Sequence, residues 1–237
     1  MSAAARRLLG GAACRVTPVG RGWGGGLNGV ACYRVATEQG DFFAKVAVEA
    51  PVPPHIDAQL QREFEQTRKA HALGLAPEPH GYDPQGGALV TDFVKGSEPR
   101  KALARQMPLL GQLVTPLRTL HESDAGAWPQ GAAFDQHGKV THWLDRVREG
   151  DKMPARQIDR LARLAARMAA RLSEHAYALQ PCHNDYYQVN IMLGRDGNVW
   201  VVDWSEAKLG DPCADLAYFA GNLDLSIDRM PELLEAY

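Results

Sequence analysis

The sequence predicts an α+β protein with two lobes, a small β-rich lobe over residues 1–94 and a mainly helical lobe over residues 95–237. Three observations predict this division. Short β-type runs separated by glycine turns fill much of the first part, helical patterns fill most of the second, and an expected β-hairpin lies near the C-terminal end. A length of 237 residues fits one large domain or two small lobes, and 45% apolar residues can supply a core.

The first lobe is expected to contain strands and one helix. The β-type runs are residues 32–37, 41–46 and 88–93. Glu38–Gly40 joins the first two runs as a hairpin. Prolines at 51, 53 and 54 break the pattern, and a helix is then expected from Ala58 to Leu73, ending at Gly74. Residues 94–97 read as the linker to the second lobe.

The second lobe is expected to be mainly helical. Its helical stretches are Leu103–Leu120, Val140–Arg148 and Ile158–Ala178. The last of these is rich in alanine and arginine, and its arginines are expected to form a solvated face and not a nucleic-acid-binding patch.

A hairpin follows a polar stretch in the last quarter of the chain. Ile191–Leu193 and Val199–Val202 are short β-type runs, and residues 194–198 between them are turn formers. This arrangement places Asn190 and Asp203 at neighbouring strand ends, close enough to share a metal ion.

The polar residues around this hairpin predict phosphoryl transfer from a magnesium nucleotide. That reaction needs one carboxylate to accept the hydroxyl proton, and an amide and a second carboxylate to hold magnesium. His183 and Asp185 with Asn190 give the pattern H-x-D-x-x-x-x-N, and Asp203 follows on the next strand. We therefore expect Asp185 as the base and Asn190 and Asp203 as metal ligands. An aspartate before a turn is more often a turn or cap residue, but turn chemistry alone does not produce all four in this register.

Candidate phosphate-binding residues lie in the first lobe. The segment Trp23–Gly29 contains Gly25, Gly26 and Asn28, and its glycines let backbone amides approach phosphates closely. A flexible turn is the alternative for this segment. Lys45 lies on the strand that follows, where a lysine can pair the α- and β-phosphates; a solvent-exposed lysine is the alternative.

Glu63 is the candidate ion-pair partner of Lys45. It lies on the following helix, where the pair would aim the ammonium group at the phosphates. Glu65 is two residues further along and faces another direction, because helix neighbours on one side are three or four residues apart.

At this point the chain resembles a known family. Cys182–Asp185, then Asp203–Trp204, then Gly210–Ala217 are similar to motifs of the aminoglycoside phosphotransferase and choline kinase superfamily. His-Asn-Asp leans toward the choline/ethanolamine kinase branch, and the resemblance runs from about Gly20 to the last residue. It implies a protein-kinase-like fold, ATP and Mg²⁺ as cofactors, and a small-molecule alcohol as substrate.

The resemblance also implies roles for supporting residues, and it favours Glu63 as the ion-pair partner of the strand lysine. His183 is expected to hold the catalytic loop by hydrogen bonding, and Asp215 to lie under that loop and accept backbone or histidine hydrogens; a helix-start cap is the alternative for Asp215. Asp92 and Val94 are expected to offer backbone hydrogen bonds to an adenine edge.

The expected acceptor is a cationic alcohol, choline or ethanolamine first, with thiamine or an aminoglycoside as runners-up. A quaternary ammonium group is best held over aromatic faces. The candidates for that pocket are the aromatic residues Tyr186, Trp204 and Tyr218 and the acidic residues Glu206 and Asp224. A core position is the alternative for Trp204, since that is the commoner fate of aromatic residues.

Two departures from the family pattern concern the acceptor side. Tyr187–Val189 stands where relatives commonly have a proline, and Ser205 separates Asp203–Trp204 from Glu206. Pro231–Tyr237 resembles the start of a helix that continues in relatives, so a fragment and a variant with an open pocket are both expected possibilities. A catalytically inactive nucleotide-binding module is the second functional hypothesis.

Composition excludes other classes. A net charge of −2 argues against a dedicated nucleic-acid or membrane-surface binder, and no apolar run approaches a membrane span. The four cysteines are scattered without a C-x-x-C pair, which favours reduced thiols in a cytoplasmic protein. The oligomeric state is left open.

Overall fold

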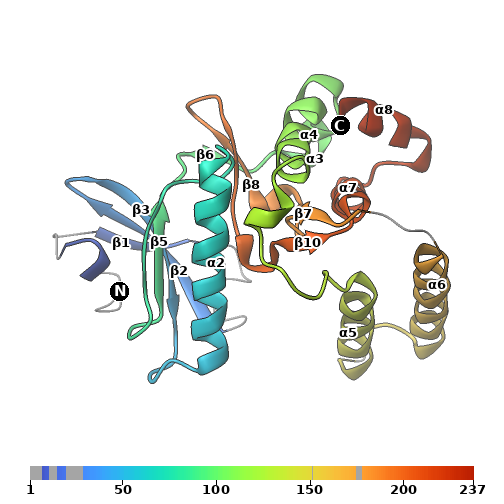
Figure 1. The fold of residues 1–237 in the computed structure, drawn as a ribbon, viewed down its shortest axis with the longest axis horizontal. Coiled ribbons are helices and arrows are strands. Elements are labelled where there is room, and N and C mark those ends of the chain that lie inside the picture. Colours follow the sequence, from blue (N-terminus) through green and yellow to red (C-terminus); the bar gives the residue numbers. More distant parts are fainter. Residues whose placement is uncertain (1–6, 11–14, 20–28, 151, 175–177) are drawn as a thin grey trace.

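The computed structural model describes residues 7–10, 15–19, 29–150, 152–174 and 178–237. A β-sheet with one long helix forms the N-lobe, and helices with two small sheets form the C-lobe (Figure 1). The predicted α+β, two-lobed fold is confirmed. No helix in the described part of the chain is long and apolar enough to cross a membrane.

The N-lobe sheet is antiparallel with strand order β1-β2-β3-β5-β4. Its strands are β1 (Arg15–Pro18), β2 (Val30–Thr37), β3 (Gly40–Ala47), β4 (Pro79–Asp83) and β5 (Ala88–Asp92). Side chains alternate across β3, so Phe42, Ala44 and Val46 face one core cluster while Lys45 points to the opposite face. That opposite face is the one that the long helix covers, because Leu89, the strand partner of Lys45, packs with the helix residue Leu60.

The helix α2 (Pro54–Ala72) begins four residues before the expected start at Ala58. Pro54 occupies the first helical position, where a missing N–H is not needed, so this proline starts the helix and does not interrupt it. Gly74, with φ of +74°, follows the C-cap and ends the helix as expected. The buried row along α2 continues from Leu60 to Glu63, while Glu65 is exposed.

The C-lobe contains the remaining elements. They are β6 (Gly96–Ser97), α3 (Lys101–Ala104), α4 (Met107–His121), α5 (Gln136–Glu149), α6 (Ala155–Ser173), β7 (Gln180–Cys182), β8 (Ile191–Gly194), β9 (Val199–Val201), β10 (Lys208–Gly210), α7 (Pro212–Asn222) and α8 (Met230–Ala236), with short 3-10 turns at Ala125–Ala127, Gln188–Asn190, Trp204–Glu206 and Ile227–Arg229. The expected hairpin is present as β8–β9, and β7 pairs with β10. The hydrophobic core of this lobe is centred on α4, and among the described residues it is the largest cluster of buried apolar side chains.

One expected helix is split in the structure. The stretch Leu103–Leu120 forms α3 and α4, with a break at Arg105–Gln106. Pro108 is the physical reason, because in a continuous helix its ring would clash with the carbonyl group of Ala104.

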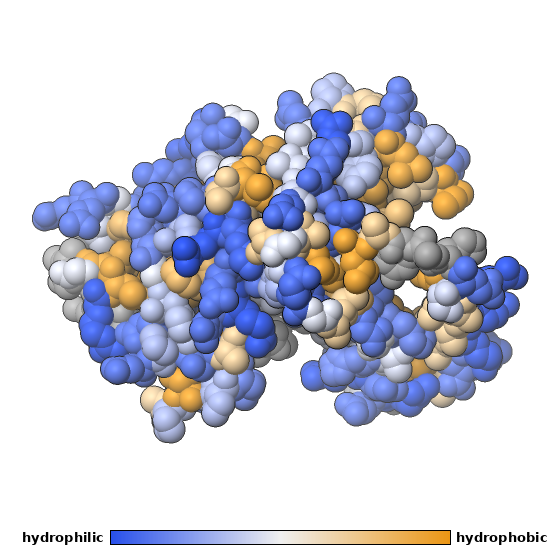
Figure 2. Space-filling view, in the orientation of Figure 1, coloured by the Kyte–Doolittle hydropathy of each residue, from blue (hydrophilic) through white to orange (hydrophobic). Residues whose placement is uncertain are grey.

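Helices α5 and α6 form a hairpin that stands apart from the other C-lobe helices (Figure 1). Of the described residues of this α5–α6 hairpin, only Ile158 is buried. The α6 arginines are exposed, as expected, but so is its apolar row, with Leu161 41% and Met168 57% exposed. Hydrophobic patches interrupt the hydrophilic surface in this part of Figure 2.

Candidate active site

The loop between β7 and β8, which the sequence predicts to be the catalytic loop, is anchored by one buried carboxylate. Asp215, near the start of α7, accepts the backbone N–H of His183 at 2.8 Å and that of Asn184 at 2.7 Å. Its side chain is 1% exposed. Asn184 has a left-handed backbone with φ of +62°, a conformation that an asparagine tolerates better than most residues. These two hydrogen bonds therefore fix the path of the chain just before Asp185.

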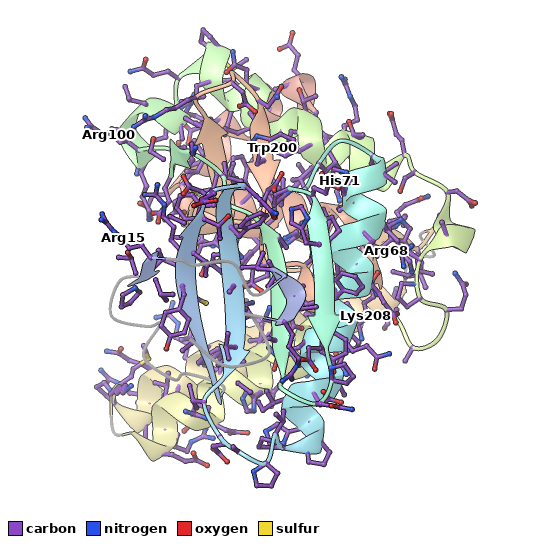
Figure 3. The ribbon with its side chains drawn as sticks, turned by 90° about the vertical axis from the view of Figure 1, so that its left-hand side faces the viewer. Arg15, Arg68, His71, Arg100, Trp200 and Lys208 are labelled. Atoms are coloured by element: carbon purple, nitrogen blue, oxygen red, sulfur yellow. The ribbon has the colours of Figure 1, made fainter. Side chains whose placement is uncertain are left out.

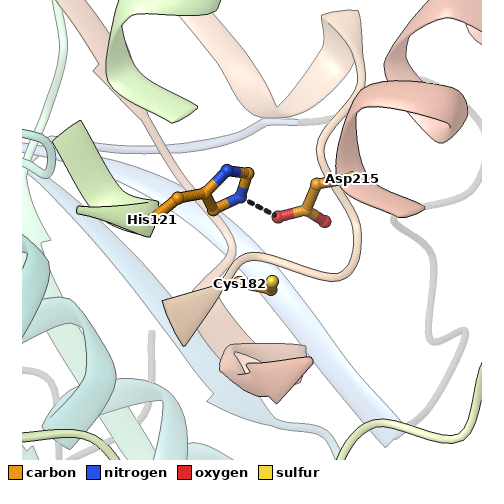
Figure 4. A group of neighbouring side chains, drawn as sticks. All are labelled: His121, Cys182 and Asp215. Atoms are coloured by element: carbon orange, nitrogen blue, oxygen red, sulfur yellow. Dashed lines mark hydrogen bonds and ion pairs between the residues drawn. The ribbon is translucent and has the colours of Figure 1, made fainter. Parts of the chain in front are cut away.

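His121, at the end of α4, is a supporting residue that the sequence reasoning missed. Its Nε2–H donates to Asp215 Oδ2 at 3.2 Å (Figure 4), and its Nδ1 lies 2.7 Å from the Tyr237 hydroxyl group. The sequence feature that could have indicated His121 is its position next to the buried Leu120, on the inner face of an amphipathic helix.

Cys182 lies beside His121 and Asp215, and the ligand atoms of these three residues lie within 4.8 Å of one another. Burial raises the pKa of the Cys182 thiol, with the Asp215 charge adding to the effect. A protonated thiol is a poor metal ligand, and both oxygens of Asp215 already accept hydrogen bonds. We therefore interpret this cluster as support for the loop.

His183 ties the loop to the hairpin strand. Its Nε2–H donates to the carbonyl oxygen of Val202 at 3.1 Å, and its ring lies edge-on to Trp204 with centroids 4.8 Å apart. The imidazole is completely buried. It therefore lies under the loop, away from the solvent-exposed surface.

Asp185 and Asn190 face each other across the catalytic loop. The Asn190 amide nitrogen donates to the backbone oxygen of Asp185 at 2.9 Å and to its Oδ2 at 3.1 Å. Both of those atoms accept hydrogen bonds, so the nitrogen of the amide must be the atom turned toward Asp185. The amide oxygen of Asn190 is consequently directed away from Asp185.

Asp203 follows β9 and lies beside Asn190. The N–H of Val202 donates to the Asn190 carbonyl oxygen at 2.9 Å, which holds the two segments together as the sequence predicts. Asp203 has a left-handed backbone with φ of +61°. Its Oδ1 accepts from Lys45 and from Ser205, each at 3.1 Å, whereas its Oδ2 accepts from no other described residue. Burial would raise the pKa of Asp203, but Lys45 together with His183 and Ser205 lowers the pKa below its ordinary value.

Lys45 and Glu63 form a buried ion pair between β3 and α2. The ammonium nitrogen lies 2.7 and 2.8 Å from the two carboxylate oxygens, and the side chains are 8% and 5% exposed. Burial raises the pKa of Glu63, although Lys45 opposes the change. Burial would lower the pKa of Lys45, but Asp203 and Glu63 together raise it, so the lysine stays charged.

The donor set fits a magnesium ion. Mg²⁺ prefers oxygen ligands and one or two carboxylates, with phosphates and water completing its shell. The Asn190 amide oxygen and Asp203 Oδ2 are the two oxygens that the hydrogen bonds leave available. These two residues are the ones that would hold it.

The linker after β5 passes a cavity of about 600 Å³ whose wall includes Asp92, Phe93 and Val94. Figure 3 labels His71 and Trp200, which also line this cavity where the lobes meet. No member of the Asp185, Asn190 and Asp203 set lines it. The backbone N–H of Phe93 is taken by the Asp41 carbonyl group, while that of Val94 donates to no described residue.

The structure corrects part of the expected acceptor pocket. Tyr186 and Trp204 are each 1% exposed and belong to the C-lobe core. The Tyr186 hydroxyl group donates to the carbonyl oxygen of Leu113, and the Trp204 indole N–H donates to that of Val201 at 2.9 Å. Both polar ends are satisfied inside the core, so neither ring offers a face to an acceptor.

The other expected acceptor residues fall in different places. Asp224 lies beyond the end of α7, where Arg105 at 3.0 Å and Lys101 at 3.5 Å pair with its charge. Glu206 is exposed. Tyr218 is 40% exposed, and the centre of its ring lies 5.7 Å from that of Tyr187. Burial raises the pKa of its hydroxyl group, and the negative charge of Asp185 adds to the effect. Of the expected set, Tyr218 is therefore the aromatic residue that remains partly exposed near Asp185.

Lys139 is a second residue that the sequence reasoning missed. It lies on α5, and its Nζ donates to Asp185 Oδ1 at 3.3 Å and to the Asn184 carbonyl oxygen at 3.1 Å. No motif marks it, because α5 lies far from the catalytic loop in the sequence. The glycine-loop residues Gly25, Gly26 and Asn28 lie outside the described residues.

Sequence comparison finds relatives of this chain among known proteins. The two LicA proteins of Haemophilus influenzae that match are each 26% identical over 181 residues, which is 75% of this chain but 66% and 52% of the relatives' own lengths. The chain thus spans less than two thirds of these relatives.

Solved structures show the same fold. A choline/ethanolamine kinase family protein from Mesorhizobium loti superposes with a TM-score of 0.72 at 21% identity, covering 97% of this chain and 71% of that one. Choline kinase LicA from Streptococcus pneumoniae gives 0.69 at 16% identity, covering 94% and 74%. A streptomycin–ATP–APH(2")-IIa ternary complex gives 0.64 at 13% identity, covering 98% and 79%. A model of the phosphotransferase enzyme family matches residues 24–237. On this match, and in keeping with the architecture of its site, the chain belongs to the phosphotransferase enzyme family.

Proposed function

We propose that this protein transfers the γ-phosphoryl group of ATP to a hydroxyl group of a small molecule. The observation that carries the proposal is the contact of one ammonium group with carboxylates of both lobes. Lys45 Nζ lies within 3.1 Å of both Glu63 in the N-lobe and Asp203 in the C-lobe. A lysine so placed can pair with nucleotide phosphates at the same point where the metal ligands meet.

Each residue has a role in this proposal. Lys45, aimed by Glu63, steadies the α- and β-phosphates, and the amide of Val94 with the carbonyl group of Asp92 recognises the adenine edge. Asn190 and Asp203 hold the magnesium ion, which when bound neutralises charge on the phosphates. Asp185 orients the acceptor hydroxyl group and accepts its proton. His183, Asp215 and His121 support the loop that carries Asp185.

The acceptor within this proposal is a small alcohol, with choline or ethanolamine first. The LicA relatives and the choline/ethanolamine kinase neighbours support this order. The aromatic pair Tyr187–Tyr218 beside Asp185 gives a physical reason, because aromatic faces attract quaternary ammonium groups. Thiamine and aminoglycosides are the runners-up, the latter supported by the streptomycin complex of a protein with the same fold.

The experiment has two parts. Calorimetric titration with ATP, with and without magnesium, measures nucleotide binding, and ADP release across a panel of choline, ethanolamine, thiamine and aminoglycosides measures transfer. Magnesium-dependent binding with acceptor-dependent ADP release supports the proposal. Binding without turnover on any acceptor supports the inactive nucleotide-binding module, while turnover only on thiamine or an aminoglycoside replaces the acceptor and keeps the mechanism.

A further inference from the structure

The carboxylate of the proposed base, Asp185, forms an ion pair with a residue from outside the catalytic loop. Lys139, from α5, lies 3.3 Å from Asp185 Oδ1, on the opposite oxygen from the one that Asn190 contacts. We propose that Lys139 is a positioning residue for Asp185. This inference rests on the proposed function and adds to it a cation that no motif of the catalytic loop supplies.

The hydrogen bonds around Asp185 define the orientation of its carboxylate. Oδ1 accepts from Lys139, and Oδ2 accepts from Asn190. A carboxylate offers roughly four lone-pair sites on its two oxygens, so sites remain for an acceptor hydroxyl group. With a partner on each oxygen, rotation of the carboxylate about its bond to Cβ breaks at least one contact.

Lys139 is itself held in place. Its Nζ also donates to the Asn184 carbonyl oxygen, and it lies 5.1 Å from the centre of the Phe134 ring and 5.8 Å from that of Tyr218. Phe134 is fixed in turn, because its N–H donates to the carbonyl oxygen of Leu209 in β10 at 2.9 Å. A long lysine side chain that forms an incidental surface pair has no such set of contacts.

Orientation matters more than base strength in this reaction. The transition state of phosphoryl transfer is loose, with little bond formation to the incoming oxygen, so catalysis depends mainly on positioning and charge stabilisation. The contact of Lys139 with Oδ1 fixes the direction in which the carboxylate points. An error of about 1 Å in such an arrangement can cost about 10²-fold in rate.

A matched control is present in the chain. Lys208 Nζ lies 5.4 Å from the centre of the same Phe134 ring, yet it makes no hydrogen bond to Asp185. Lys139→Met, Lys139→Arg and Lys208→Met are therefore compared with the parent protein by steady-state kinetics in ATP and in the best acceptor. Thermal unfolding of each variant verifies that it is folded.

We expect Lys139→Met to lower kcat by about 10- to 100-fold with the KM for ATP changed by less than about twofold. Lys139→Arg, which keeps the cation, should recover much of kcat, and Lys208→Met should stay within about twofold of the parent. An effect of Lys139→Met equal to that of Lys208→Met, a change confined to KM, or a gain in kcat overturns the proposal.

A binding measurement separates this proposal from the proposed function. Magnesium ADP with aluminium fluoride mimics the phosphoryl group in transfer, and transition-state mimics gain from interactions that ground-state ligands lack. If the parent protein binds this mixture no more tightly than magnesium ADP and releases no ADP with any acceptor, the kinase function fails and the role of Lys139 fails with it. If the parent shows the gain and Lys139→Met retains all of it, Lys139 alone is wrongly assigned.

Discussion

Lys45 and Asp203, separated by 158 positions in the sequence, meet at 3.1 Å where the two lobes face each other. Lys45 reaches this point because β3 alternates its side chains and turns this one toward α2, where Glu63 completes the pair. Asp203 reaches it because the β8–β9 hairpin ends there with a left-handed residue. The ammonium group thus links the nucleotide side of the proposed site to its metal side.

The first prediction concerns the stability of the Lys45–Glu63 pair. Lys45→Met should lower the free energy of unfolding by about 3–5 kcal/mol, because it leaves a buried carboxylate without its partner. The double variant Lys45→Met/Glu63→Leu should regain most of that loss while remaining inactive. Urea denaturation measures both. A single variant as stable as the parent, or a double variant no more stable than the single one, contradicts the pair's role in folding.

The second prediction is the pH dependence of that loss. Burial raises the pKa of Glu63 above its ordinary value of 4.5, and removal of Lys45 takes away a charge that opposes this shift. A folded state with a raised carboxyl pKa retains its proton while the unfolded chain releases it, so stability falls as pH rises through this window. In the parent the pKa of Glu63 is already raised to about 7, so parent and variant lose stability in parallel below that pH, and the extra destabilisation of Lys45→Met should grow as the pH rises above about 7. Denaturation curves at several pH values check this, and a pH-independent difference would contradict it.

The third prediction concerns the base. Asp185→Asn should lower kcat by about 10²- to 10⁴-fold, because the amide neither accepts the hydroxyl proton nor carries the charge that Lys139 faces. ATP affinity should change little, since the proposed phosphate contacts come from Lys45 and the metal ligands. ADP-release kinetics and calorimetry measure the two quantities. A kcat within a few-fold of the parent removes Asp185 from this role.

The fourth prediction concerns the metal. Asp203→Ala should abolish the part of ATP binding that depends on magnesium, because a site of this kind relies on one or two carboxylates together with the phosphates. Removal of magnesium from the parent with EDTA should produce a similar loss. Titrations with and without magnesium compare them. Unchanged magnesium-ATP affinity together with continued turnover would show that Asp203 is not the ligand.

Residue spacing predicts the part of the site that is local along the chain, whereas the Lys45–Glu63 pair and the place of Asp215 were predicted with the help of the family resemblance. Asp185, Asn190 and Asp203 lie on one loop and one hairpin, so their spacing and the turn chemistry between them determine their neighbourhood. Lys139 and His121 were missed because each acts on a residue from a distant segment, and nothing in their own surroundings marks that contact.

Residue type alone also could not separate core from pocket. Tyr186 and Trp204 flank catalytic positions, yet each is buried with its polar end satisfied by a backbone carbonyl group. The fold was more accessible, because glycine turns, strand patterns and helical periodicity repeat over many residues. Two of its errors fell at Pro54 and Pro108, where a proline lies in the first turn of a helix and periodicity alone does not reveal the boundary. The helices expected at Val140–Arg148 and Ile158–Ala178 also begin earlier than expected, at Gln136 and Ala155.

Asp185 and Lys139, which meet at the proposed base, are supported by different parts of the structure. Asp185 is fixed by the core, through Asp215 and His121, whereas Lys139 belongs to the α5–α6 hairpin, in which only one described residue is buried. Substitutions in the hairpin can therefore shift Lys139 with little loss of folding stability. Substitutions at Asp215 or His121 would lower the stability of the folded protein. Turnover and folding stability are in this respect separable, and substitutions in α5 can change kcat with little change in stability.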